Sequence, residues 1–175
     1  MEKQTGVQIV MWSREDEWLE QIINLYQKVW NIDTDCTEQF KRHMTYEGFR
    51  GRICLDEEHK PIAFAYGYAS LPGQYYHELL SNHLKADLST EWLTDCFEFV
   101  ELCVHPSKRQ LGIGTLLHEH VLKDMPYKTS VLTTQQSNLP ARMLYEARRW
   151  IVVDDSFIPN PITKERYLIY GKKLN

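Results

Sequence analysis

The stretch of residues 97–122 constrains the fold of this chain more than any other. Residues 97–106 are rich in β-forming side chains and end in a proline, and residues 107–114 form a short basic loop that contains Gly112 and Gly114. Residues 115–122 then have the apolar spacing of a helix. A strand, a glycine loop and a helix in this order bring several backbone N–H groups to a helix N-terminus, and such a site suits a phosphate group.

The length and charge of the chain limit the classes of protein to consider. Its 175 residues fit one domain, 1–175, with a hydrophobic core of ordinary size. The formal net charge of -4 argues against a nucleic-acid partner and slightly favours a cationic small substrate.

The four cysteines indicate a reducing environment. Cys36, Cys54, Cys96 and Cys103 form no CxxC pair, so we expect free thiols rather than a disulfide framework or a zinc site. The first residues lack the apolar core of a signal peptide, and no apolar stretch reaches the length that spans a bilayer. We therefore expect a cytoplasmic protein with no membrane partner.

Periodicity and turn residues divide the rest of the chain into strands and helices. Strands are predicted at 7–12, 49–56, 61–70, 130–135, 151–157 and 165–170, besides the run at 97–106. Helices are predicted from a capping box at Ser13 and Asp16 to about residue 30, at 35–46, at 75–88, at 113–125 and after the N-cap Asn138. The segment 71–94 is predicted to be a helical insertion. This order predicts an α/β fold (α+β, mixed sheet) with helices flanking the sheet.

Apolar spacing also predicts which side chains are buried. The helix at 113–125 has one apolar face, formed by Ile113, Leu116, Leu117, Val121 and Met125. The helix after Asn138 has Pro140 in its first turn and a predicted buried stripe of Leu139, Met143, Leu144 and Ala147. Several aromatic side chains either bind a cationic amine or pack in the core, namely Tyr66, Tyr68, Tyr75, Tyr76 and Trp92.

Three motifs, in this order, resemble those of a known family. They are Glu101-Leu102-x-Val104-x-Pro106, then Arg109-x-x-Gly112-x-Gly114, then Asn138 followed by Ala141-x-x-Leu144-Tyr145-Glu146. Together they resemble the GNAT superfamily of acyl-CoA-dependent N-acyltransferases, and the order of elements matches that family over nearly the whole chain. The resemblance implies a mixed, mostly antiparallel sheet with splayed central strands.

The resemblance also implies an activity. Acetyl-CoA would be the co-substrate, and an acetyl group would pass by direct attack in a ternary complex to a primary amine of a small molecule or peptide. The alternative is a catalytically silent acyl-CoA sensor of the same fold. A homodimer is a further possibility that the sequence leaves open.

The family pattern assigns the cofactor to the loop and to the strand before it. The pyrophosphate would lie on the helix start and the loop, over Arg109, Gln110, Leu111, Gly112, Ile113, Gly114 and Thr115. Arg109 either adds a charged contact or is a solvated neighbour of Lys108. The pantetheine arm would pair with Leu102, Cys103 and Val104, where a bulge would aim one N–H at the thioester oxygen. Asn138 would bind the pantetheine amide or the substrate, besides capping its helix.

The same pattern suggests the catalytic groups. Tyr145 would protonate the departing thiolate, or it is an ordinary half-buried helical tyrosine. The attacking amine needs a base, for which Glu101 and then Glu98 are the candidates. Their odd spacing sends them to opposite faces of a regular strand unless a bulge intervenes, and each is otherwise a structural carboxylate.

Some residues depart from the pattern or offer other chemistry. Family members commonly have a glycine four residues after the tyrosine, where this chain has Arg149 before Trp150. His118 and His120 point in different directions on a helix, so we expect no metal site. Cys103 is expected to be a small buried residue rather than an acylated one.

Overall fold

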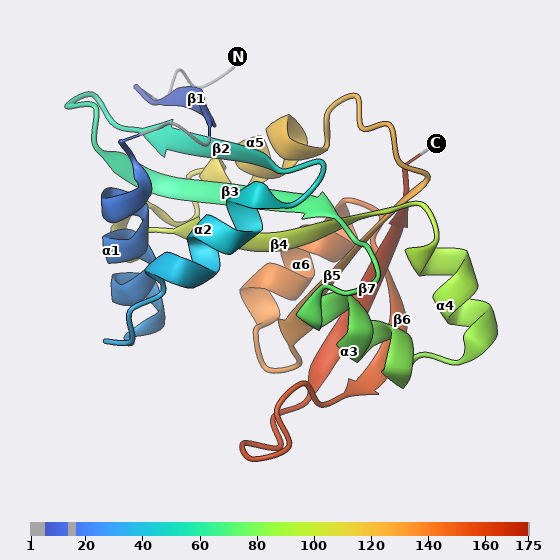
Figure 1. Ribbon diagram of the computed structural model, residues 1–175. Coiled ribbons are helices and arrows are strands. Elements are labelled where there is room, and N and C mark those ends of the chain that lie inside the picture. The colour runs from blue at the N-terminus through green and yellow to red at the C-terminus, as the bar shows by residue number, and fades with distance from the viewer. Residues whose placement is uncertain (1–5, 14–16, 175) are drawn as a thin grey trace. The chain divides into compact units, whose positions relative to one another are not determined.

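The computed structural model describes residues 6–13 and 17–174, and Figure 1 shows their helices and strands. The chain divides into two compact units. Unit 1 comprises Met1–Tyr68 and Val100–Asp124, and unit 2 comprises Ala69–Phe99 and Met125–Asn175. Asp16 of the predicted capping box lies outside the described residues, as does the N-terminal stretch 1–5. The first helix begins at Leu19 with Trp18 as its N-cap.

Unit 1 contains the first three strands and the helices that accompany them. Its elements are β1 (Gln8–Trp12), α1 (Leu19–Trp30), α2 (Thr37–Thr45), β2 (Arg50–Leu55), β3 (Pro61–Ala69), the C-terminal half of β4 (Cys96–Val104), the 3-10 turn η1 (Pro106–Lys108) and α5 (Ile113–Leu122). β1 pairs antiparallel with β2, and β2 pairs antiparallel with β3. Bulky side chains from these strands and from α1 and α2 form one core cluster, with Trp12 against Phe40, Phe64 and Tyr66.

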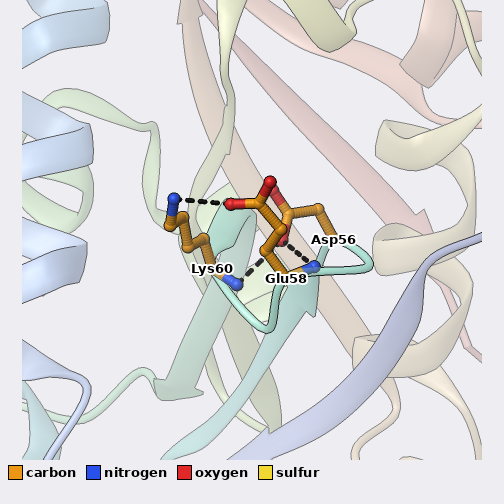
Figure 2. A network of polar contacts seen from close by, with 3 residues as sticks. All are labelled: Asp56, Glu58 and Lys60. Atoms are coloured by element: carbon orange, nitrogen blue, oxygen red, sulfur yellow. Dashed lines mark hydrogen bonds and ion pairs between the residues drawn. The ribbon is translucent and has the colours of Figure 1, made fainter.

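A tight turn joins β2 to β3 (Figure 2). The Asp56 Oδ1 accepts hydrogen bonds from the backbone N–H groups of Glu58 and Lys60, each at 2.9 Å, and the Lys60 ammonium lies 2.7 Å from Glu58 Oε2. His59 takes the left-handed conformation with φ 59 that the reversal requires. The local sequence therefore fixes the hairpin as predicted.

Unit 2 contains the insertion and the C-terminal strands. Its elements are α3 (Tyr75–His83), α4 (Ala86–Leu93), the N-terminal half of β4, β5 (Thr129–Gln135), α6 (Leu139–Ala147), β6 (Ile151–Phe157) and β7 (Tyr167–Lys173). β7 pairs antiparallel with both β5 and β6, whereas β4 pairs parallel with β5. The insertion helices bury Leu80 and Trp92 in a cluster with Val131 and Ile169 of the sheet.

Hydrogen-bonded neighbours give the strand order β1-β2-β3-β4-β5-β7-β6. The β4–β5 ladder is parallel and runs from Cys96↔Thr129 to Glu98↔Val131, although β4 continues to Val104 and β5 to Gln135. The predicted mixed, mostly antiparallel sheet flanked by helices is confirmed.

Besides the later start of the first helix, two predicted helices end or break where the sequence pattern does not. The helix expected at 75–88 is two helices, because Leu84 and Lys85 are extended. The helix expected to reach residue 125 ends at Leu122, because Lys123 is extended and Asp124 is left-handed with φ 52. In both cases the apolar spacing continues beyond the end of the helix, and the helix ends where the backbone conformation of one or two residues changes.

Burial corrects the predicted stripe of α6. Leu139 is 60% exposed and Met143 is 71% exposed, and Ala147 is exposed too, whereas Tyr145 is buried. The helix turns its aromatic side chain inward because that ring packs against other rings of unit 2. Of the aromatic residues considered for amine binding, Tyr66, Tyr68 and Trp92 are core residues, and Tyr75 is exposed.

Candidate functional site

Two backbone hydrogen bonds between the β3 and β4 segments enclose one residue more on the β4 side than on the β3 side. The Ser70 N–H donates to the Cys96 carbonyl at one end (2.9 Å), and the His105 N–H donates to the Ile62 carbonyl at the other (2.9 Å). The segment 62–70 thus faces the segment 96–105, which is longer by one residue. An extra residue on one strand of an antiparallel pair is a β-bulge.

Core packing locates this bulge. Val100 and Cys103 both pack in the core cluster of unit 1, although residues three apart point to opposite faces of a regular strand. The extra residue therefore lies between them, next to Glu101 and Leu102. This agrees with the bulge that the family resemblance implied for the strand.

Backbone directions beyond the bulge follow from His105, whose N–H points at β3. Successive residues alternate in direction, so Cys103 also faces β3, whereas Leu102 and Val104 direct their N–H and C=O groups away from it. Two bonds agree with this: the Leu102 N–H donates to Glu101 Oε1 (3.1 Å), and the Val104 carbonyl accepts from Arg109 Nε (3.3 Å). Within the predicted pantetheine segment, Leu102 and Val104 are the residues whose backbone is turned outward.

Glu101 is a carboxylate with a strongly shifted proton affinity. Burial raises its pKa to about 7, while hydrogen bonds from the Leu102 N–H and from the Trp30 side chain oppose the rise. A carboxyl group whose pKa lies near neutral pH holds and releases a proton readily there, which is the property of a general base. Trp30 was not predicted as a site residue, because the end of α1 is distant in sequence and carries no motif.

Glu98 is the more deeply buried of the two candidate bases and belongs to unit 2. Its side chain is 4% exposed, and its Oε2 has no hydrogen-bond partner among the residues described. Burial raises the pKa of this carboxyl to about 8. At neutral pH the group is mainly protonated, so it suits the role of a proton donor or structural acid better than that of a base.

The loop between β4 and α5 has the backbone of an anion site. The His105 ring accepts from the Ser107 N–H (3.2 Å), and Gln110 and Gly112 are left-handed with φ 62 and φ 82. A side chain added at Gly112 would meet nothing within 4 Å, so the space over this residue is open. Alternating left-handed residues turn successive N–H groups toward one side.

The same loop ends at the start of α5. Gly112 is the N-cap, and its carbonyl accepts the first intrahelical bond from the Leu116 N–H (3.0 Å). The N–H groups in the first turn of a helix have no intrahelical acceptor, and the helix dipole adds partial positive charge there. Unit 1 therefore brings together Glu101, the outward backbone of β4 and residues 109–115, and this loop could hold a phosphate.

Unit 2 contains the other predicted site residues, Asn138 and Tyr145. The Asn138 side chain accepts from the Ala141 N–H (3.3 Å), which confirms the predicted N-cap. Tyr145 is 7% exposed, and its ring centroid lies 5.9 Å from that of Trp150 and 6.4 Å from that of Phe99. Its ring is thus held in one orientation by packing.

Arg149 ends α6 in place of the glycine that the family pattern favours. It is left-handed with φ 63. The Trp150 N–H donates to the Tyr145 carbonyl and the Arg149 N–H donates to the Glu146 carbonyl, both at 3.2 Å. These are the two bonds of a Schellman motif. The turn therefore forms without glycine, at the energetic cost of a left-handed arginine.

Other candidate chemistry is limited in the part of the chain that the structure describes. The four cysteines are buried free thiols, and burial raises the pKa of the Cys103 thiol, so this side chain is a core residue as predicted. Within residues 6–13 and 17–174, no group of three His, Cys, Asp or Glu side chains is placed to hold a metal ion. No helix in these ranges has the length and apolar character to cross a membrane.

Comparisons with known proteins agree with this architecture. The sequence profile of the acetyltransferase (GNAT) family matches residues 10–149. A sequence comparison with curated proteins found no match. In fold, the chain is similar to the ribosomal-protein-S18-alanine N-acetyltransferase of Escherichia coli, with a TM-score of 0.69 and 17% identity over 96% of this chain and 95% of that one.

Two further solved structures have a similar fold. NAA60 of Arabidopsis thaliana, in complex with a bisubstrate analogue, gives a TM-score of 0.69 and 15% identity over 96% of this chain and 100% of that one. The smu.2055 protein of Streptococcus mutans gives a TM-score of 0.71 and 15% identity over 96% and 99%. The profile match covers most of the chain and includes the β4–α5 loop, so the chain belongs to the GNAT family of acetyltransferases.

Proposed function

We propose that this protein is an N-acetyltransferase that moves an acetyl group from acetyl-CoA to a primary amine. The observation that carries the proposal is the loop from Arg109 to Gly112, which ends at the start of α5 and has open space over its left-handed glycine. Family membership supports the acetyl transfer, and the loop supports a cofactor that bears phosphate groups.

In this proposal the cofactor lies along unit 1. The backbone from Arg109 to Gly114 and the start of α5 at Thr115 hold the pyrophosphate, and the helix dipole stabilises its charge. The outward N–H and C=O groups of Leu102 and Val104 pair with the pantetheine amides, as an added strand would. Arg109 then exchanges its present bond to the Val104 carbonyl for a contact with the cofactor.

The chemistry requires a base and an acid from the chain. Acetyl-CoA supplies the thioester, whose carbon–sulfur bond breaks as the carbon–nitrogen bond to the amine forms. Glu101 accepts the proton that the attacking amine loses, because its pKa of about 7 matches neutral pH. Tyr145 donates its phenol proton to the thiolate, and Asn138 supports the pantetheine amide or the acceptor. Glu98 ranks second as a candidate for the base, because it is mainly ionised only above its pKa of about 8.

A thermal-shift experiment with two glycine variants tests the cofactor. Acetyl-CoA is expected to raise the melting temperature of the wild type, and Gly112→Trp is expected to abolish the rise because it fills the open space over the loop. Gly73→Trp is the matched control, since Gly73 is also left-handed with nothing within 4 Å of an added side chain. The cofactor assignment is wrong if acetyl-CoA does not raise the melting temperature of the wild type. It is also wrong if Gly112→Trp and Gly73→Trp respond to acetyl-CoA in the same way.

Release of free CoA thiol in the presence of amines tests turnover. The panel contains a peptide with a free N-terminus, a peptide with a lysine, a polyamine and an aminoglycoside. Tyr145→Phe is expected to slow thiol release while keeping the acetyl-CoA thermal shift, because it removes only the proton donor. A thermal shift without thiol release from any amine would indicate the silent sensor instead.

A further inference from the structure

A groove of unit 1 lies at the C-terminal end of α5, where no part of the proposed cofactor binds. The groove has a volume of about 630 Å³ and is formed by the end of β1, the start of β2 and the end of α5. This size is in the range of pockets that hold small molecules. Because α5 has ten residues, its two ends are about 15 Å apart, so the groove is separate from the β4–α5 loop.

Positive charge dominates the lining of this groove. Arg50, Arg52 and Lys123 line it together with His120, whereas Asp124 is the one acidic side chain among its lining residues as described. The protein as a whole has a net charge of -4, so the cluster is a local exception to an acidic chain. Like charges held this close are unfavourable unless an anion compensates them.

Hydrogen bonds to backbone carbonyls hold both arginines in place. The Arg50 Nη1 donates to the carbonyls of Val121 and Lys123 at the end of α5, and the Arg52 Nη1 donates to the Gly51 carbonyl (2.8 Å). Both side chains are half-buried. Burial and the charge of Arg50 lower the pKa of Arg52, which agrees with two neighbouring cations. The guanidinium groups are therefore ordered before any ligand arrives, which favours binding.

Met11 adds an apolar surface beside the arginines, because it lies opposite Arg52 in the β1–β2 ladder and the side chains of paired residues share one face of a sheet. Trp12 is almost fully buried behind Gly51, where an added Cβ would meet the Trp12 ring at 2.9 Å. Phe49 is half-buried with its ring 5.5 Å from that of Trp12, and Met11 is 68% exposed at the rim. The Trp12 and Phe49 rings therefore pack in the core cluster of unit 1, on the opposite face of β2 from Arg50 and Arg52, and a ligand in the groove meets the cations and Met11.

We infer that this groove binds a small organic anion that carries a phosphate or carboxylate group beside an apolar or aromatic part. Arg52 and Lys123 contact the anionic group, and Arg50 adds charge while it caps α5. Met11, which pairs with Arg52, contacts the apolar part. The site is separate from the proposed pyrophosphate loop at the other end of α5.

Titration calorimetry with phenyl phosphate tests the inference. Phenyl phosphate is expected to bind the wild type more tightly than inorganic phosphate does, because its ring also contacts Met11. Arg52→Gln and Lys123→Gln are each expected to weaken binding about tenfold, the effect of one charge-assisted contact. Both variants keep the Arg50 bonds to α5, and the exposed Lys123 gives a variant whose folding is not at risk. Benzoate carries a carboxylate on the same ring, so comparing the dissociation constants of benzoate and phenyl phosphate shows whether the groove prefers a carboxylate or a phosphate ligand.

Two further variants separate this site from other anion sites. Lys60→Gln removes one positive charge from unit 1 at an exposed turn outside the groove and is expected to leave binding unchanged. Gly112→Trp alters the proposed pyrophosphate loop and is also expected to leave binding unchanged. The inference is overturned if neither anion binds at up to about 10 mM, if Arg52→Gln and Lys123→Gln bind as the wild type does, or if Gly112→Trp abolishes binding.

Discussion

The buried carboxyl of Glu98 gives a quantitative prediction about stability and pH. Its pKa is about 8 in the folded protein against an ordinary value of 4.5. A raised pKa in the folded state means that the folded protein prefers the protonated form. The stabilising effect of that proton is complete below about pH 4.5 and is lost as the pH rises through about 8.

The size of the effect follows from the shift. Each pH unit between the two pKa values lowers the free energy of unfolding by about 1.4 kcal/mol, so the whole shift corresponds to about 5 kcal/mol as an upper limit. Glu98→Gln removes the titration and keeps the shape of the side chain. The variant is therefore expected to gain stability relative to the wild type as the pH rises, and to resemble it in acid.

Urea unfolding of both proteins from about pH 5 to about pH 9 measures this difference directly. Glu119→Gln, which removes an exposed carboxylate from α5, reports what the loss of one negative charge does by itself. If the difference between Glu98→Gln and the wild type stays constant over this range, the carboxyl does not titrate as its burial implies, and the reasoning fails.

Two helix ends give smaller predictions. Asn138→Ala is expected to lower the free energy of unfolding by about 1 kcal/mol because it removes the side chain that caps α6, whereas Asn138→Asp keeps the acceptor and should be nearly neutral in the same urea experiment. Equal losses in both would contradict a capping role. Arg149→Gly is expected to raise the free energy of unfolding by about 1 kcal/mol, and the melting temperature by about 3 °C, because glycine accepts φ 63 without strain. Arg149→Ala removes the same charge but keeps the strain, so a similar gain in that variant would show that charge, not conformation, is responsible.

Features that depend on nearby residues were predictable from the sequence. The β4–α5 loop, the hairpin turn at Asp56 and the cap at Asn138 each rest on proline, glycine or a short polar side chain within a few residues. The same holds for the strand positions, because alternation and β-branched or aromatic residues mark them locally. These parts of the fold are confirmed with shifts of a few residues at their ends.

Features set by distant partners were not predictable in the same way. The prediction of the buried stripe of α6 was wrong because the amphipathic spacing of this helix allows two orientations. Ring packing around Tyr145 selects the orientation that leaves Met143 exposed. The contact between Trp30 and Glu101 joins positions far apart in the chain. The bulge in β4 depends on its pairing with β3, which no window of the β4 sequence contains.

The bulge also connects the two roles that the proposed function gives to Glu101 and Leu102. The bulge lies where the Leu102 N–H points away from β3, and this N–H donates to the Glu101 carboxylate. The hydrogen bond lowers the pKa of Glu101, whereas burial raises it. If the Leu102 N–H donates instead to a pantetheine carbonyl, the carboxylate loses this donor and its pKa rises further. Docking of the cofactor would then raise the proton affinity of the Glu101 carboxylate at the moment when the amine must lose its proton, while a smaller fraction of the group stays ionised at neutral pH. A regular strand would not couple the two events, because each N–H would already be committed to a ladder or directed away from the carboxylate.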